Sequence, residues 1–153
     1  MKLTKQQEAN LLELDISGKG GKDAEIAIAL GFERESAKYH DALDKNGKKW
    51  EFKKQQNQQF LDPYKFAQMS KEEKNIDILF FMHKNGKIME IYKTNYKKLI
   101  KTMGYGAWDL KAIKKLYQRQ CFVKRSNTQI KAELKYHEIK TFKKIWERKR
   151  KSS

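Results

Sequence analysis

Two acids and a lysine lie close together in the sequence, at a spacing that could support the hydrolysis of phosphodiesters. Asp41 precedes a polar turn, and Glu51 and Lys53 follow it with one residue between them. A pair of carboxylates binds a hard cation such as Mg²⁺, which keeps water ligands and leaves room for phosphate oxygens. An adjacent ammonium group favours a metal-bound hydroxide and offsets the negative charge of the transition state. These three are therefore the candidate catalytic residues, and Mg²⁺, with Mn²⁺ as a substitute, is the expected cofactor.

The three side chains can meet only if the chain around them forms a β-hairpin of one particular register. Residues 44–47 are a strong turn signal between two β-type segments. A loop of three residues that ends with Gly47 in the left-handed region brings Asp41 opposite Glu51. A loop of two or four residues would move these side chains to the other face, so the hypothesis depends on the loop length.

The alternation of side chains along a strand decides which neighbours belong to the site. Lys53 should leave the same face as Glu51, because the two are separated by one residue. Asp44 falls on the other face, and an aspartate at a hairpin corner is more often a turn residue than a metal ligand. His40 also points away in this register, and we expect it to contact DNA or to support the structure.

Two helices are predicted on the N-terminal side of this hairpin. Thr4 and Gln7 have the spacing of a capping box and begin a helix within residues 1–17. A second, largely apolar helix runs from Ala24 to Leu30, and we expect it to be buried. Glu25 is the one acid inside it, and a buried acid is costly unless it is paired. It either faces solvent at the helix edge, which we favour, or reaches the metal as an additional acid.

Strands and further helices follow the hairpin. The segments expected are strands over 76–82 and 88–92 joined by a second Asn-Gly turn, a helix over 96–103 capped by Asn95, a helix after Asp109, a strand over 130–136, and a last basic helix anchored by Phe142, Ile145 and Trp146. This order predicts an α+β, or mixed α/β, fold in a single domain, 1–153. Its expected parts are an N-terminal helix (1–17), a catalytic core (23–103) and a basic C-terminal helix or tail (140–153).

The charge balance indicates an anionic partner. The chain has 153 residues, with 35 Lys and Arg against 19 Asp and Glu, and a formal net charge of +16. Such an excess opposes compaction and attracts nucleic acid, so DNA is the first candidate. The single cysteine, Cys121, excludes a disulfide scaffold, and no apolar run approaches the roughly 20 residues that span a bilayer. We therefore expect a soluble, cytoplasmic protein that contacts nucleic acid and no membrane.

The hairpin resembles the active site of the PD-(D/E)xK nucleases. Asp41 followed by Glu51-Phe52-Lys53 is similar to the metal-binding motif of that superfamily. The whole segment 40–53 is similar to the active-site hairpin of a type II restriction endonuclease, although His40 stands where the motif usually has a proline. Two further segments, between roughly residues 20 and 103, add to the resemblance: Gly20-Gly21-Lys22 before the apolar helix, and Gly86-x-x-x-Glu90-Ile91-Tyr92 after the second hairpin.

The resemblance implies a restriction-endonuclease-like core with a central, mainly antiparallel sheet flanked by helices. It implies that Asp41, Glu51 and the backbone carbonyl of Phe52 bind Mg²⁺. Lys53 would orient the attacking water. The implied activity is site-specific cleavage of double-stranded DNA by a homodimer, in the cytoplasm of a prokaryotic or virus-infected cell. The expected dimer contact is the N-terminal helix, through Leu11, Leu12 and Leu14.

Amide side chains directly after the catalytic strand are candidates for reading bases. Asn and Gln can form bidentate hydrogen bonds to adenine in the major groove, whereas a solvated polar loop explains any single one of them equally well. The histidine-rich base-reading segment of the similar enzymes is absent, so their target sequence cannot be transferred. The candidate DNA-binding residues are Gln55, Gln56, Asn57, Gln58, Gln59, Tyr64, Lys65 and Gln68.

Two other functions remain open at this point. A structure-selective nuclease of the junction-resolvase type would use the same two acids and lysine on the same core. A basic nucleic-acid-binding protein without catalysis would not need them. The face that carries Asp41, Glu51 and Lys53 therefore separates the nucleases from the binding protein.

Overall fold

The structure, a computed structural model, describes residues 1–18, 22–35, 40–55, 58–60, 76–102 and 133–149. The helices within these residues are α1 (Lys5–Glu13), α2 (Asp23–Leu30), α4 (Tyr96–Thr102) and α6 (Tyr136–Ile139). The strands are β1 (Glu33–Arg34), β2 (Ala42–Leu43), β3 (Lys49–Gln55), β4 (Gln58–Phe60), β5 (Ile76–Lys84), β6 (Lys87–Asn95), β7 (Glu133–Lys135) and β8 (Lys143–Glu147).

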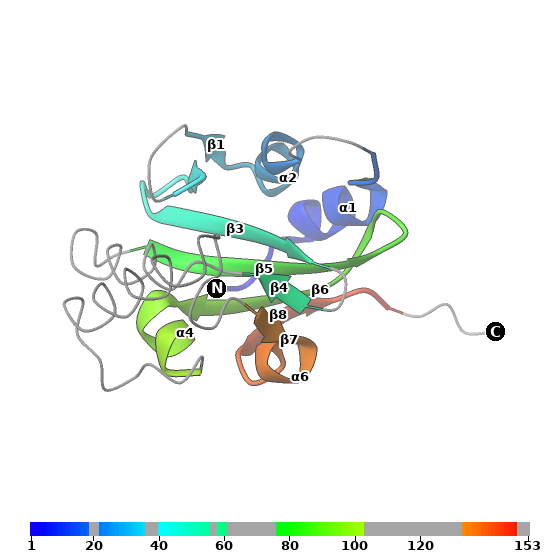
Figure 1. Cartoon of the computed structure of the whole chain (residues 1–153). Coiled ribbons are helices and arrows are strands. Elements are labelled where there is room, and N and C mark those ends of the chain that lie inside the picture. Colours follow the sequence, from blue (N-terminus) through cyan, green and yellow to red (C-terminus); the bar gives the residue numbers. More distant parts are fainter. Residues whose placement is uncertain (19–21, 36–39, 56–57, 61–75, 103–132, 150–153) are drawn as a thin grey trace.

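A six-stranded open sheet forms the centre of this part of the chain (Figure 1). Its strand order is β1-β2-β3-β5-β6-β8, in which β3 and β5 are parallel and the other neighbours are antiparallel. The antiparallel pair β4 and β7, which we call the β4–β7 ribbon, forms a separate small sheet. The expected α+β class, with a mostly antiparallel sheet flanked by helices, is confirmed.

Each face of the sheet has its own apolar core, because side chains alternate along the strands. On one side, which we call the α1–α2 face, Leu11 of α1 and Ile26 of α2 cluster with Phe52 of β3. On the other side, the α4–α6 face, Leu99 of α4 and Ile139 of α6 belong to a cluster with side chains of β5. In Figure 1, α1 and α2 lie above the sheet, and α4 and α6 lie below it.

Local signals set the ends of the N-terminal helices. The capping box forms as expected, because Gln7 N donates to Thr4 Oγ1 and Thr4 N donates to Gln7 Oε1. Helix α2 ends at Gly31, whose φ of 70° is left-handed. One side of α2 is buried, whereas Ile28 is 75% exposed. The expectation of a buried helix is therefore correct for one side of α2 only.

Most of the later elements also form where the sequence predicts them. Asn95 Oδ1 accepts a hydrogen bond of 2.9 Å from Lys98 N and so caps the first turn of α4. Residues 133–135 of the expected strand 130–136 form β7, and Tyr136 begins α6. The helix expected after Asp109 lies outside the described residues. No helix in the described part of the chain is long and apolar enough to cross a membrane.

The C-terminal segment corrects the expectation of a basic helix. Residues 143–147 form strand β8, which pairs antiparallel with β6. Phe142 and Trp146 have helical spacing, but they lie in the cores on opposite faces of the sheet. The edge of β6 supplies backbone hydrogen-bond partners along a half-buried surface, and this tertiary context prevails over the local pattern.

The turn between β5 and β6 lies against the segment that follows α1. Asn85 and Gly86 both have positive φ, 52° and 81°. Ile16 N donates to Gly86 O at 2.8 Å. A Cβ atom on Gly86 would lie 2.3 Å from Asp15 Oδ1 and 2.7 Å from Ser17 Cβ. Glycine is therefore required here both by the turn and by the close approach of residues 15–17.

We expect Gly86→Ala to lower the free energy of unfolding more than Gly47→Ala does. Both glycines have positive φ, which costs another residue about 1 kcal/mol or more. At Gly47 no atom lies within 4 Å of an added Cβ, so only this cost applies. At Gly86 the clash adds to it, for a loss of about 2–4 kcal/mol. Urea denaturation measures both losses, and equal losses would contradict the steric role of residues 15–17.

Candidate active site

The expected register of the hairpin is confirmed at Leu43, which is paired with Lys49. Strands β2 and β3 are antiparallel, and Ala42 is paired with Trp50. Gly47 has a φ of 77° and closes the loop in the left-handed conformation, as the sequence predicts. The paired residues end at Ala42, and Asp41 lies just outside them, so the expected pairing of Asp41 with Glu51 is not part of the ladder.

Asp44 holds the loop of the hairpin together. Its Oδ1 accepts hydrogen bonds from the backbone N of Asn46 and Lys48, at 2.9 and 3.0 Å. Its Oδ2 accepts a third from Trp50 Nε1, at 3.1 Å. Burial raises the pKa of Asp44, but these hydrogen bonds outweigh it and hold the pKa below its ordinary value of 3.8. Asp44 is therefore a turn residue, as expected.

Asp41 leaves the strand ladder and bonds to the backbone of β3 through its side chain. Phe52 N donates to Asp41 Oδ2 at 2.8 Å. The N–H and C=O groups of a residue in a strand point toward the same neighbour, so the Phe52 carbonyl is directed toward the side of β3 on which Asp41 lies. The Asp41 backbone is fixed as well, because its N donates to Trp50 O and its O accepts from Glu35 N, each at 2.8 Å.

Glu51 and Lys53 lie on the α4–α6 face of β3. In the parallel pairing with β5 they are next to Ile78 and Phe80, which both belong to the core on that face. Lys53 Nζ lies 3.3 Å from Glu51 Oε1. Glu51 is only 4% exposed. Buried carboxylates in proteins are paired or coordinate metals, which makes Glu51 the strongest single indication of a functional site.

Lys54, the next residue along β3, has a different role. Its side chain leaves the α1–α2 face, where its Nζ lies 2.6 Å from Asp23 Oδ1 at the start of α2. Strand alternation thus separates two consecutive lysines. Lys53 lies beside Glu51, whereas Lys54 ties α2 to the sheet.

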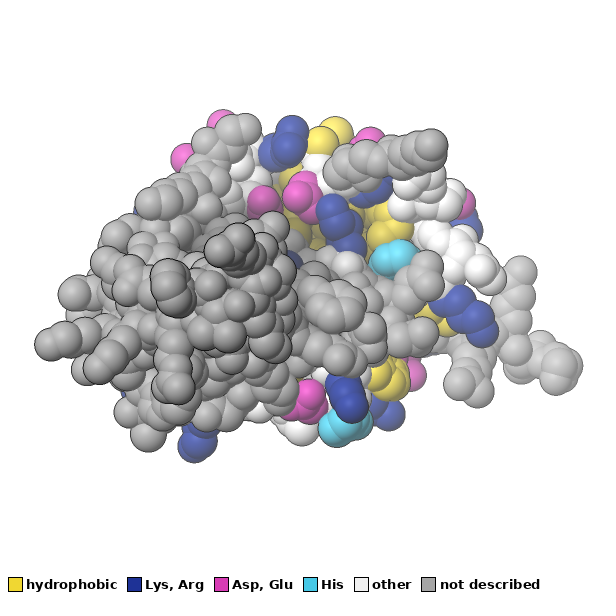
Figure 2. Space-filling view, in the orientation of Figure 1, with side chains coloured by type: hydrophobic (Ala, Val, Ile, Leu, Met, Phe, Trp, Pro, Cys, Tyr) yellow, Lys and Arg dark blue, Asp and Glu magenta, His cyan; other side chains and the backbone are white. Residues whose placement is uncertain are grey.

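Phe52 joins the two parts of the candidate site, because its N donates to Asp41 and its neighbours along β3 are Glu51 and Lys53. Mg²⁺ binds through one or two carboxylates and retains waters and substrate oxygens. Asp41, Glu51 and the Phe52 carbonyl would supply oxygen donors only, and such donors fit Mg²⁺ better than zinc. In Figure 2, acidic side chains and a basic one lie next to each other near the region where Figure 1 shows β3.

Glu25 lies away from Glu51, and His40 is buried next to Glu35. Glu25 is exposed on α2, which covers the α1–α2 face, so the structure does not bring it to Glu51. His40 is buried, and its Nε2 lies 3.5 Å from Glu35 Oε1. Of the two roles expected for His40, burial supports the structural one.

Only part of the candidate DNA-binding segment belongs to the described residues. By its backbone Gln55 ends β3, and Gln58 and Gln59 belong to β4. Those outside the described residues are Gln56, Asn57, Tyr64, Lys65 and Gln68. Base reading by this segment therefore stays a prediction.

Sequence reasoning missed a polar cluster around Glu90 of β6. The available signal was a single acid within the apolar run 88–92, because an acid in a half-buried strand needs donors around it. Its partners Tyr136 and Lys144 come from α6 and β8. They are too distant along the chain for any local pattern to show the contact.

The functional interpretation depends on the geometry of this hairpin. No protein-family model matches the chain, and no curated protein matches it significantly in sequence. What supports a function is therefore the placement of Asp41, Glu51 and Lys53, the resemblance of their motif, and the charge of the chain.

We expect Asp44→Ala to lower the free energy of unfolding by about 1–2 kcal/mol at pH 7, because three donors of a partly exposed turn lose their acceptor. The pKa of Asp44 is lower in the folded than in the unfolded state, so its contribution is present above its ordinary pKa of 3.8 and is lost as the pH falls through the folded value. Urea denaturation at pH 7 and pH 3 should show a smaller difference between wild type and variant in acid. A difference independent of pH would contradict a role for the charged carboxylate.

Proposed function

We propose that this protein is a Mg²⁺-dependent type II restriction endonuclease that hydrolyses both strands of DNA at a specific sequence. The observation that carries this proposal is the buried Glu51 beside Lys53, on the strand whose Phe52 N donates to the Asp41 carboxylate. The resemblance of the motif and the net charge of +16 support the same function. On this proposal the sheet and its helices form a restriction-endonuclease-like core.

The three residues and one carbonyl divide the chemistry between them. Asp41, Glu51 and the Phe52 carbonyl would hold Mg²⁺. Bound there, Mg²⁺ supplies a Lewis acid for the phosphate oxygens and lowers the pKa of a bound water. Lys53 orients the attacking water and offsets the negative charge that develops on the phosphate. Glu51 Oε1 lies 3.3 Å from Lys53 Nζ and keeps the lysine ammonium directed toward the attacking water.

Affinity and specificity for DNA would come from different groups. Lysine side chains on the surface neutralise phosphates and bind any sequence. Sequence would be read by side chains within 55–59 and 64–68, which can match the donors and acceptors of adenine. On this proposal, most substitutions on the lysine-rich surface weaken binding to all DNA alike.

Cutting both strands at a two-fold symmetric site requires two active sites, so we propose a homodimer. The structure corrects part of the contact expected from the sequence. Leu11 is fully buried in the core of its own chain, and Leu14 packs partly against the same core, because this side of α1 covers the sheet. Within the described residues, Leu12 on α1 and Ile28 on α2 are the exposed large hydrophobic side chains. These two are now the candidates for the dimer contact.

Incubation of plasmid DNA with the protein and Mg²⁺ tests this function. Discrete fragments of constant length support a sequence-specific endonuclease. Cleavage of branched DNA without discrete plasmid fragments would instead indicate a structure-selective nuclease. Binding of DNA without any cleavage would indicate a nucleic-acid-binding protein and would contradict the proposal.

We expect Lys53→Met to lower the rate of cleavage by about 10²-fold or more, because it removes the charge that faces the phosphate. Lys54→Met is the matched control, since its side chain leaves the opposite face and pairs with Asp23. This control should cut within a few-fold of the wild-type rate. Single-turnover cleavage at saturating Mg²⁺ measures both rates. Equal rates in the two variants would show that Lys53 has no catalytic role.

We expect cleavage to require Mg²⁺ or Mn²⁺, and Ca²⁺ to support binding without cutting. Ca²⁺ binds carboxylate oxygens at longer distances and in looser geometry, so it activates water poorly. Cleavage assays after treatment with EDTA and readdition of each cation measure this dependence. Glu51→Gln should raise the concentration of Mg²⁺ needed for half-maximal rate. Full activity in excess EDTA would rule out the metal mechanism.

A further inference from the structure

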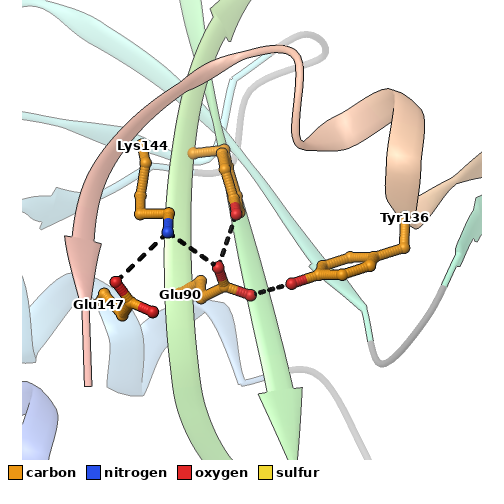
Figure 3. A network of polar contacts seen from close by, with 5 residues as sticks. Glu90, Tyr136, Lys144 and Glu147 are labelled. Atoms are coloured by element: carbon orange, nitrogen blue, oxygen red, sulfur yellow. Dashed lines mark hydrogen bonds and ion pairs between the residues drawn. The ribbon is translucent and has the colours of Figure 1, made fainter. Parts of the chain in front are cut away.

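Glu90 is the centre of a polar network on β6 (Figure 3). Its carboxylate accepts a hydrogen bond of 2.6 Å from Tyr92 Oη and another from Tyr136 Oη. Lys144 Nζ lies 3.4 Å from Glu90 Oε2 and 3.3 Å from Glu147 Oε2. Figure 3 shows Tyr136 reaching Glu90 from α6, whereas Lys144 and Glu147 reach the network from β8.

The network keeps Glu90 charged in a position where only 14% of its side chain is exposed. Burial raises the pKa of Glu90, but the hydrogen bonds from Tyr136, Tyr92 and Lys144 outweigh it and hold the pKa below its ordinary value. Burial and the neighbouring carboxylate raise the pKa of both tyrosines, so both remain hydrogen-bond donors. Hydrogen bonds to a charged acceptor are shorter and stronger than those between neutral groups.

Tyr136 connects this network to the β4–β7 ribbon. It directly follows β7 and is the first residue of α6. β7 pairs antiparallel with β4, and Leu134 lies opposite Gln59. β4 in turn follows β3, the strand that carries Glu51 and Lys53, after two intervening residues. The hydrogen bond between Tyr136 and Glu90 therefore affects β4, because β4 pairs with β7. β4 is the strand that follows the candidate active site along the chain.

The ribbon lies on the same face of the sheet as the candidate catalytic residues. Leu134 of β7 is fully buried in the core on the α4–α6 face, and Glu51 and Lys53 project from that face of β3. Apolar burial of Leu134 attracts the ribbon to the sheet without fixing its direction. The hydrogen bond from Tyr136 to Glu90 supplies a directional contact.

We propose that Glu90 is a positioning residue, which through Tyr136 fixes the β4–β7 ribbon against the face that carries Glu51 and Lys53. Its consequence for catalysis rests on the proposed nuclease function. In that function the ribbon holds the chain after β3 in place beside the substrate, so a displaced ribbon would move bound DNA relative to the candidate catalytic residues.

Tyr136→Phe and Tyr92→Phe form a matched pair of variants. Each removes one phenol donor from Glu90 and keeps the ring that packs in the core. Only Tyr136 is attached to the ribbon, since Tyr92 lies on β6 itself. We therefore expect both variants to lose a comparable amount of global stability. A difference in hydrogen exchange that is confined to the β4–β7 ribbon would isolate the positioning role of the Tyr136–Glu90 contact.

Hydrogen exchange of the backbone amides, followed by mass spectrometry on the full chain, measures the opening of the ribbon. We expect Tyr136→Phe to speed exchange in residues 58–60 and 133–139 about tenfold, and Tyr92→Phe to change it less than about twofold. Exchange in β5 should not distinguish the two variants. Equal effects of the two variants on the ribbon, or no effect of either, would overturn the proposal.

Cleavage of plasmid DNA tests the catalytic consequence separately. We expect Tyr136→Phe to lower kcat about tenfold while the Kd for random-sequence DNA in Ca²⁺ stays unchanged, and Tyr92→Phe to retain kcat. Faster exchange with an unchanged kcat would overturn the catalytic part. If the wild-type protein cuts no DNA, the nuclease function fails, and the exchange comparison still decides whether Glu90 holds the ribbon.

Discussion

The hydrogen bond from Phe52 N to the Asp41 carboxylate is the contact on which the candidate active site depends. It forms at Asp41, the residue before β2 begins, and holds this acid beside the strand that carries Glu51 and Lys53. The register that permits it is set by the loop that ends at Gly47, and Asp44 stabilises this loop. A shift of one residue in the pairing of β2 with β3 would move Glu51 and Lys53 into the core on the α1–α2 face. The candidate site therefore depends on the loop.

The features that the sequence predicts correctly are those that short-range patterns determine. Gly47 and the Asn85-Gly86 pair specify their hairpins because few other residues adopt positive φ. Apolar alternation then decides which face of each strand is buried, and side chains such as Thr4 cap helices. The coarse fold class and the register of the β2–β3 hairpin were therefore accessible from the sequence.

The features that it does not predict depend on partners that are distant along the chain. Glu90 and Tyr136 are separated by 46 residues, and β8 forms only because β6 offers it an edge. Leu11 and Leu12 are chemically identical, and only the packing of α1 on the sheet buries one and exposes the other. The bend that directs the Asp41 carboxylate to the backbone of β3 has no counterpart in the residue pattern.

The two edges of the sheet have consequences for how the chain avoids aggregation. An edge strand presents unsatisfied backbone groups that can template pairing with another chain. β1, at one edge, has only two residues, which is too short to nucleate a fibril. β8, at the other edge, is longer, but Lys143 and Lys144 are exposed along it. Lys144 is paired with Glu90 and Glu147, so Lys143 is the lysine of β8 whose charge would oppose the pairing of two copies at this edge.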